Sequence, residues 1–404
     1  MDLRNFLLIL SLAIALLALG CGGGSGLGST SGSNPPVAPP TQNVQPIAVN
    51  AGPAGNYANG VFTSVTVCLP SNASDCQTIS GVLVDTGSVG LRILASALNL
   101  ALPQQTNAAA APIAECNQFE DGYTWGPIKT ANIKIAGEQA ASVPVQVIGD
   151  PAFSTVPKGC TSTGLTAEDN LQTLGANGVL GVGLFAQDCG GACALFGVSN
   201  PGLYYACPPS GCVSTSEDLA QQVQNPVSLF ATDNNGVIIE LPQVPSTGAP
   251  SLAGSLVFGI GTQSNNRLGN ATVFATDASG NISTTYNGQS YTAFLDTGSN
   301  ALYILDATTT GLPTCANASA FYCPPVTKTF SATNHSVNGA SAPVSFSVAN
   351  ADTLFATPNV AFSNLAGPNP STFDWGLPFF YGHNVFTAIQ GQSTPNGPGP
   401  YFAY

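Results

Sequence analysis

A ten-residue segment occurs twice in this chain of 404 residues, at positions 85–94 and 296–305. Seven of the ten positions are identical in the two copies: Asp, Thr, Gly, Ser, Leu, Ile and Leu. Each copy follows a short apolar run, at residues 82–84 and 293–295, that predicts a buried strand. A carboxylate at the end of a buried strand is costly unless it is hydrogen-bonded or takes part in chemistry. The repeat therefore predicts one site built from two halves of the chain.

The apolar-apolar-Asp-Thr-Gly-Ser pattern, present twice, resembles the pepsin-like bilobed aspartic peptidases. More narrowly, the chain resembles an uncharacterised family of bacterial lipoproteins that carry two such motifs. The resemblance implies an all-β fold of two mostly antiparallel β lobes, with the active site in the cleft between them. It also implies an aspartic-type endopeptidase in which Asp85 and Asp296 are catalytic. The residues that support the two catalytic loops would be Thr86, Gly87, Ser88, Thr297, Gly298 and Ser299.

Two carboxylates brought within hydrogen-bonding distance share one proton and titrate as a pair. The ionised member can take a proton from a water molecule while the protonated member polarises the scissile carbonyl. By the same resemblance, the two Thr hydroxyls cross-link the loops, and the two Ser hydroxyls hydrogen-bond the carboxylates. This chemistry requires no cofactor. No metal is expected either, because His335 and His383 are the only histidines and no Cys-x-x-Cys occurs.

A second motif follows each aspartate loop and resembles the apolar-apolar-Gly signature of the same family. In the first half this motif ends at Gly181, 96 positions after Asp85. In the second half, Asp374-Trp375-Gly376 occupies the equivalent place, and its Gly376 lies 80 positions after Asp296. Glycine is expected there because the strand passes too close to the aspartate loop for a side chain.

Residues 119–126 occupy the place of the family's flap, a β-hairpin that closes over the substrate. Counting back from Trp125, the position of the flap tyrosine falls on Phe119, which has no hydroxyl. Tyr123 lies nearer the turn and is the alternative source of a hydroxyl. The candidate flap residues are therefore Phe119, Tyr123 and Trp125, and the competing interpretation is a surface hairpin with ordinary aromatic packing.

Arg92 is a further departure from the family, which commonly has an aromatic residue here that supports the flap. Our hypothesis from the sequence is that Arg92 pairs with Glu120 or Asp121 of the flap.

The composition fits many short strands joined by turns, because the chain has 45 Gly, 31 Pro and only 7% charged residues. The formal charge of −13 disfavours nucleic acid and anionic membrane surfaces as partners. The expected partner is a peptide or protein substrate, and we expect a monomer. We expect contact with a membrane only through an N-terminal lipid.

Residues 1–20 resemble a bacterial lipoprotein signal peptide, with Cys21 as the lipidated first residue of the mature chain. An ordinary secretory signal is the alternative. Residues 21–56 are rich in Gly, Ser and Pro and predict a flexible tether. A lipid on Cys21 would place the protein in the bacterial cell envelope. The residue after Cys21 is Gly22 and not an aspartate. The sorting pattern favours a lipid anchor in the outer membrane, facing the periplasm or the surface.

The remaining ten cysteines predict a disulfide framework in an exported chain. Two pairs each flank a short loop, Cys68 with Cys76 and Cys315 with Cys323. Cys116 and Cys160 are what remains once the other cysteines are paired. The other four either pair locally or cross with one another: Cys189, Cys193, Cys207 and Cys212.

We expect an N-terminal lobe at residues 57–230, which contains Asp85, and a C-terminal lobe at residues 231–404, which contains Asp296. The main alternative to an endopeptidase is a catalytically silent pepsin-like binding lipoprotein of the cell envelope. Inactive members of such families usually lose an Asp or the following Gly, whereas both Asp-Thr-Gly-Ser sets are intact here. An unrelated all-β structural lipoprotein would require both repeated motifs to be coincidental.

Overall fold

The computed structural model of the chain describes residues 42–162, 164–195 and 200–404. The expected signal peptide, the lipidation candidate Cys21 and the expected tether as far as residue 41 lie outside the described residues. Within the described part the fold is all-β, and its α-helices have only four or five residues each. None of the described helices is long and apolar enough to span a membrane.

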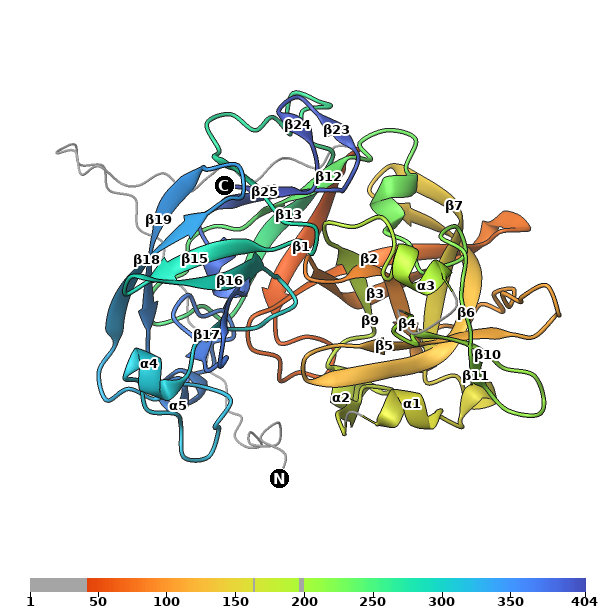
Figure 1. Ribbon diagram of the computed structural model, residues 1–404, viewed down its shortest axis with the longest axis horizontal. Coiled ribbons are helices and arrows are strands. Elements are labelled where there is room, and N and C mark those ends of the chain that lie inside the picture. Colours follow the sequence, from red (N-terminus) through yellow and green to blue (C-terminus); the bar gives the residue numbers. More distant parts are fainter. Residues whose placement is uncertain (1–41, 163, 196–199) are drawn as a thin grey trace, which may run out of the picture.

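The molecule has two halves that lie side by side, with strands β1, β12 and β13 between them (Figure 1). One sheet runs from the first half into the second in the order β11-β10-β5-β6-β7-β4-β9-β3-β2-β1-β13-β12-β22-β25-β14. A seven-stranded sheet, β19-β18-β15-β16-β21-β17-β20, completes the second half. This arrangement confirms the bilobed, pepsin-like all-β fold that the sequence predicted.

The strands of the first half are β2 (Gly60–Leu69), β3 (Asn72–Asp85), β4 (Val89–Leu94), β5 (Ile113–Gln118), β6 (Gly122–Ile135), β7 (Glu138–Ile148), β8 (Thr166–Ala167), β9 (Gly178–Val182), β10 (Tyr204–Ala206) and β11 (Val213–Ser214). The strands that join the halves are β1 (Val44–Asn50), β12 (Gly236–Glu240), β13 (Leu252–Phe258), β14 (Val273–Ala275), β22 (Asn384–Ala388) and β25 (Tyr401–Ala403). The seven-stranded sheet contains β15 (Ile282–Tyr286), β16 (Gln289–Leu295), β17 (Leu302–Ile304), β18 (Lys328–His335), β19 (Ser341–Val348), β20 (Ala366–Gly367) and β21 (Thr372–Trp375).

A small hairpin and several short helical turns complete the structure. The hairpin is formed by β23 (Ser393–Thr394) and β24 (Gly397–Pro398). The α-helices are α1 (Lys158–Thr161), α2 (Leu171–Leu174), α3 (Gly191–Ala194), α4 (Ala307–Thr310), α5 (Ala351–Phe355) and α6 (Leu377–Phe380). The 3₁₀ turns are η1 (Ala95–Ala97), η2 (Pro151–Phe153) and η3 (Pro226–Leu229). The predicted lobe boundary after residue 230 falls between η3 and β12 and remains a prediction.

The predicted tether is wrong for its last part. Residues 44–50 form strand β1, which pairs with β13 on one side and with β2 on the other. Val44, Ile47 and Val49 of this strand are buried. Burial of these three side chains between the halves favours a strand over a flexible segment.

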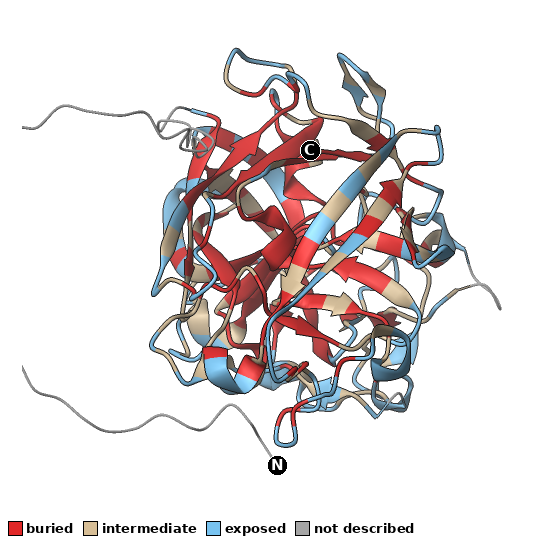
Figure 2. Cartoon of the chain, turned by 90° about the vertical axis from the view of Figure 1, so that its left-hand side faces the viewer, coloured by how far each residue is buried: buried red, intermediate tan, exposed pale blue. Residues whose placement is uncertain are grey.

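The core is continuous between the two halves. Its largest cluster of buried apolar side chains includes Val84 and Leu180 of the first half and Leu295 and Trp375 of the second. Figure 2 shows the same pattern, with buried residues along the strands and exposed residues mainly in the connections. A shared core holds the halves in one orientation, which a site built from both halves requires.

Five disulfides are present among the described residues, and they use all ten cysteines after Cys21. The two predicted short-loop pairs and the Cys116–Cys160 pair are confirmed. The open question of the other four cysteines is resolved as local pairing, Cys189–Cys193 and Cys207–Cys212. Four of the five disulfides therefore lie in the first half.

Candidate active site

The two aspartates occupy equivalent positions in matching three-strand units. In the first half, β3 runs parallel to β9, which is antiparallel to β4, and Asp85 at the end of β3 is level with Gly181. In the second half, β16 runs parallel to β21, which is antiparallel to β17, and Asp296 follows the last residue of β16. The strands before both aspartates end in largely buried residues, as the apolar runs predicted. Each half therefore presents its carboxylate from the end of a buried strand.

The glycine of each loop lies directly against the carboxylate of the other half. A Cβ atom added to Gly87 would be 2.5 Å from Cγ of Asp296, and one added to Gly298 would be 2.6 Å from Oδ1 of Asp85. No real Cβ can approach so closely, so any larger residue would force the two loops apart. The structure thus brings Asp85 and Asp296, which are 211 positions apart in the sequence, to one place.

The two threonines connect the loops through reciprocal hydrogen bonds. The Thr86 N–H donates to the Thr297 hydroxyl oxygen (3.1 Å), and the Thr297 N–H donates to the Thr86 hydroxyl oxygen (3.0 Å). Each hydroxyl in turn donates to a carbonyl of the opposite half, Thr86 to Leu295 (3.3 Å) and Thr297 to Val84 (2.8 Å). Both threonines are buried. These four bonds fix the separation of the loops.

Each carboxylate accepts hydrogen bonds from its own loop, and the two sets are similar. Asp85 accepts from the Gly87 N–H (2.8 Å) and from the Ser88 hydroxyl (2.5 Å). Asp296 accepts from the Gly298 N–H (2.7 Å) and the Ser299 hydroxyl (2.7 Å). Asp85 has one more donor, the Ser88 N–H at 3.2 Å.

The electrostatic surroundings of the two carboxyls differ. Burial raises the pKa of Asp296 well above its ordinary value, and Asp85 and Asp374 raise it further, through their charges and a hydrogen bond with Asp85. The hydrogen bond from the Ser299 hydroxyl acts in the opposite direction and lowers the pKa of Asp296. The raised pKa favours the protonated form of Asp296. The arrangement is suited to one shared proton that resides mainly on Asp296.

The glycines of the second motif lie beneath the loops, as expected. A Cβ added to Gly181 would be 2.6 Å from the Val89 backbone, and one added to Gly376 would be 2.1 Å from the Ala301 carbonyl oxygen.

Asp374 is a third buried carboxyl at this site that the sequence analysis assigned only to the glycine motif. It lies in β21 opposite Phe294. Burial raises the pKa of Asp374 to about 8; a hydrogen bond with Ser299 lowers it, and the charges of Asp85 and Glu120 raise it. The sequence did contain a signal, namely an acidic residue within an apolar strand two positions before the motif glycine.

Arg92 is completely buried, and its partners are not the predicted ones. Instead of Glu120 or Asp121, the guanidinium contacts Glu115 of strand β5 (2.7 Å) and Asp188 (2.9 Å). It also donates to Asn117 (3.1 Å) and to the Val89 carbonyl. Although burial lowers the pKa of Arg92, the two carboxylates outweigh it and raise the pKa overall. The charged residues at the flap tip are exposed to water, whereas Glu115 and Asp188 are buried and need a cationic partner.

The predicted flap is the β5–β6 hairpin, closed by the Phe119 N–H donating to the Gly122 carbonyl (2.8 Å). Tyr123 and Trp125 pack in an apolar cluster with the Cys116–Cys160 disulfide, and the indole N–H of Trp125 donates to the Phe153 carbonyl (2.7 Å). In the described part of the chain no hydrogen bond joins Tyr123 to Asp85 or Asp296.

The flap residues whose charge affects the site are at the tip. Glu120 contributes to the raised pKa of Asp374, and Asp121 contributes to the raised pKa of Tyr303, a change due mainly to burial. The charges of the hairpin tip therefore act on residues of the second half.

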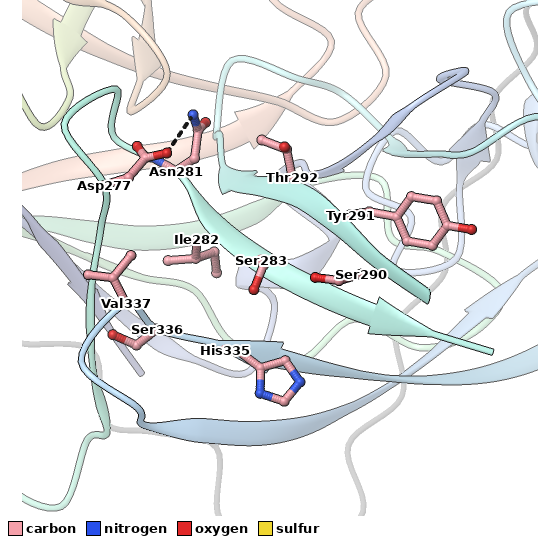
Figure 3. A pocket seen from close by; sticks show the side chains of 10 residues that line it. All are labelled: Asp277, Asn281, Ile282, Ser283, Ser290, Tyr291, Thr292, His335, Ser336 and Val337. Atoms are coloured by element: carbon pink, nitrogen blue, oxygen red, sulfur yellow. Dashed lines mark hydrogen bonds between the residues drawn. The ribbon is translucent and has the colours of Figure 1, made fainter. Parts of the chain in front are cut away.

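A cavity lies elsewhere, at the seven-stranded sheet of the second half (Figure 3). It has a volume of about 290 Å³ and is lined by polar and apolar side chains of β15, β16 and β18, including Ser283, Tyr291 and His335. His335 shares a hydrogen bond with the Thr285 hydroxyl (3.0 Å). Since neither Asp85 nor Asp296 lines this cavity, we do not assign the chemistry to it.

Among the described residues, one group has the spacing of metal ligands, namely Cys315, Cys323 and Asp352. The two cysteines form a disulfide, so they have no thiolate to offer a metal. The chemistry of this group does not fit a metal centre.

Comparisons with known proteins agree with the fold. A family described as "Protein of unknown function (DUF3443)" matches residues 39–404. Among solved structures, the chain resembles the aspartic proteinase from Irpex lacteus, with a TM-score of 0.51 and 14% sequence identity. That similarity covers 89% of this chain and 96% of the proteinase. A search of curated protein sequences found no match. At 14% identity the structural similarity supports the pepsin-like fold alone.

Proposed function

Because the chain belongs to the family described as "Protein of unknown function (DUF3443)", its activity has to be inferred from the site, and we propose that it is an aspartic endopeptidase. Asp85 and Asp296 would hydrolyse peptide bonds with a water molecule activated between them. The observation that carries the proposal is the contact between the loops. The glycine of each loop lies against the other half's carboxylate, and reciprocal threonine bonds hold the loops together.

The proposed reaction begins with one proton on the pair. Ionised Asp85 accepts a proton from water as the water oxygen bonds to the carbonyl carbon, and Asp296 gives its proton to the carbonyl oxygen. A tetrahedral diol results. Asp85 then gives its proton to the leaving nitrogen as the carbon–nitrogen bond breaks, and Asp296 recovers a proton from a diol hydroxyl. The site returns to its initial protonation state without a covalent intermediate.

The surroundings of the carboxyls support this division of roles. The raised pKa of Asp296 favours the acid that polarises the carbonyl. The three hydrogen bonds to Asp85 hold its carboxylate in a fixed position, as a base that takes a proton from water requires. A carboxylic acid that stays protonated into the weakly acidic range can donate to a substrate carbonyl over a wider pH range than an ordinary aspartic acid.

The test is cleavage of a peptide library between pH 3 and pH 8 by the full chain and by the Asp296→Asn variant. We expect cleavage at internal peptide bonds by the wild type and at least an ~100-fold lower rate for the variant. A folded wild-type protein that cuts no peptide would overturn the proposal and favour a catalytically silent binding protein. Equal cleavage by the variant would exclude the two-carboxylate mechanism.

We also propose that a lipid on Cys21 anchors the protein in the bacterial cell envelope, in the outer membrane. The five disulfides are consistent with an oxidising compartment. Replacing Cys21 with Ser should release the protein from membrane fractions or block its maturation. Unchanged membrane retention would contradict lipid anchoring at this residue.

A further inference from the structure

Asp374 occupies a position in the second half whose counterpart in the first half is apolar. It lies two residues before Gly376 in β21 and is level with Phe294 of β16. The equivalent residue of β9 is Val179, two residues before Gly181 and level with Leu83 of β3. Val179 packs in a cluster of apolar side chains that includes Leu83, Phe62 and Ile148. The equivalent positions therefore carry a carboxyl in the second half and an apolar valine side chain in the first.

The carboxyl of Asp374 is buried but only partly satisfied. The residue is 5% exposed, and its Oδ1 atom has no hydrogen-bond partner among the described residues. The ion pairs of the described chain are Arg92 with Glu115, Arg92 with Asp188, and Lys129 with Asp150, so none involves Asp374. A buried carboxylate without a cation is strongly disfavoured. In the free protein this carboxyl consequently holds a proton, in keeping with its pKa of about 8.

The two charges that raise the pKa of Asp374 are both negative. They belong to Asp85 of the first aspartate loop and to Glu120 at the tip of the flap. Asp374 in turn raises the pKa of Asp296. An apolar substrate side chain would leave Oδ1 of Asp374 without a hydrogen-bond partner. An ammonium or guanidinium group that reaches this buried Oδ1 would supply the missing hydrogen-bond partner and offset the negative charges around it.

We propose that Asp374 is a specificity-determining residue that binds the side chain of a substrate lysine or arginine next to the scissile bond. The proposal rests on the proposed peptidase function, because Asp374 lies beside Asp296 in the same site. It assigns a substrate class, peptides with a basic residue flanking the cleaved bond. The preference is expected on one side of the scissile bond only, because the equivalent position of the first half carries Val179 and not a carboxyl.

A cation bound at Asp374 would favour the ionised carboxylate, so the pKa of Asp374 would be lower in the complex than in the free protein. Binding a basic substrate at a pH below 8 would then release a proton. The preference for a basic over a neutral residue should therefore increase as the pH rises towards about 8 and then level off.

The experiment compares pairs of peptides that differ at one position, lysine in one and norleucine in the other. Norleucine matches the lysine side chain as far as its terminal methylene but has no charge. The substitution is placed on each side of the scissile bond in turn. The proteins are the wild type, Asp374→Asn, and Asp352→Asn as a matched control, because Asp352 is an exposed acid in the same half. The readout is kcat/KM from pH 4 to pH 8.

We expect the wild type and Asp352→Asn to cut the lysine peptide at least about tenfold faster than the norleucine peptide on one side of the bond. The preference should rise with pH. In Asp374→Asn the preference should disappear at every pH, while norleucine peptides are still cut. Equal cleavage of both peptides by the wild type, or a preference retained by Asp374→Asn, would overturn the assignment of Asp374. Failure of the wild type to cut any peptide would instead overturn the proposed peptidase function.

Discussion

The two aspartate loops differ little, whereas the residues around them differ strongly. Both loops keep the glycine contact, the threonine bonds and the serine bonds. Seven residues after each aspartate, however, the first half has the buried cation Arg92 and the second has Tyr303, which hydrogen-bonds Asn300 (2.7 Å). Two residues before the motif glycine, the first half has Val179 and the second half has Asp374. The two halves have the same residues in the loops that bring the carboxyls together. They differ at the positions that pack around those loops.

The largest expected effect tests whether the loops act as one unit. Asp85→Asn and Asp296→Asn each keep the shape of the carboxyl but remove either the base or the shared proton. Each variant should lose at least ~100-fold in kcat/KM. The double variant should be about as inactive as either single one, because groups that act together are not additive. The measurement is peptide cleavage by the three variants, with Asp352→Asn as the control that retains activity.

A large loss of kcat/KM in only one of the two single variants would show that the two aspartates are not functionally equivalent. Losses that multiply in the double variant would mean that the two carboxyls contribute independently.

The next effect concerns Arg92 and its counterpart Tyr303. Arg92→Met would leave Glu115 and Asp188 as buried charges without a cation, at a cost of about 3–5 kcal/mol in the free energy of unfolding. Tyr303→Phe removes one hydrogen bond and should cost about 1 kcal/mol. Urea unfolding of both variants measures the difference.

A triple variant tests whether the stability lost in Arg92→Met comes from the unpaired charges of Glu115 and Asp188 or from the changed side-chain shape. Adding Glu115→Gln and Asp188→Asn to Arg92→Met removes the stranded charges, so much of the lost stability should return. Equal destabilisation by Arg92→Met and Tyr303→Phe would show that the two positions are energetically alike.

The pH dependence of folding distinguishes acids of the two halves. In the fold, the pKa of Asp374 is raised to about 8 by burial and that of Glu217 in the first half to about 7, also chiefly by burial. Both groups bind protons more tightly when folded. The protonated carboxyls therefore contribute fully to the free energy of unfolding below pH about 4. This contribution is lost as the pH rises through the pKa values that the two groups have in the folded protein. We expect the free energy of unfolding to fall between pH 4 and pH 8.

Asp374→Asn should flatten this dependence by a few kcal/mol, and by more than Glu217→Gln, because the shift at Asp374 is larger. Urea unfolding at several pH values provides the measurement. An unchanged slope in Asp374→Asn would mean that its carboxyl is not buried as described.

An effect smaller than that of Arg92→Met is expected at a connection between the halves. Asn59 donates to the carbonyls of Asn300 (2.8 Å) and Phe362 (2.9 Å), and its side-chain oxygen accepts from the Phe362 N–H and the Tyr381 hydroxyl, both at 2.7 Å. Asn59→Ala leaves these groups unpaired and should lower stability by about 1–3 kcal/mol. Thermal unfolding can be compared with Asn107→Ala, whose side chain bonds only to its neighbours Ala109 and Ala111. Equal melting temperatures for the two variants would contradict this role.

The aspartate loops and the second motif could be predicted because each is a short local pattern repeated in both halves. Strand β1 could not, since its few apolar residues stand in a segment of loop-like composition, and its stability comes from partners such as β13, about 200 positions away. The partners of Arg92 were missed for a similar reason, as Asp188 is distant in sequence. Asp374 was visible but was assigned to a motif, because burial without a cation is a property of the fold alone.

The central claim is that residues from the two halves form one acid–base site, and a statine-type inhibitor tests it most directly. The hydroxyl of such a compound mimics the tetrahedral intermediate between the carboxyls, and transition-state mimics bind at least ~100-fold more tightly than substrates. Calorimetric titration of the full chain should show one binding site, with affinity lost to a similar extent in Asp85→Asn and Asp296→Asn. A folded wild-type protein that ignores the inhibitor, or one that binds it unchanged after either substitution, would contradict the claim.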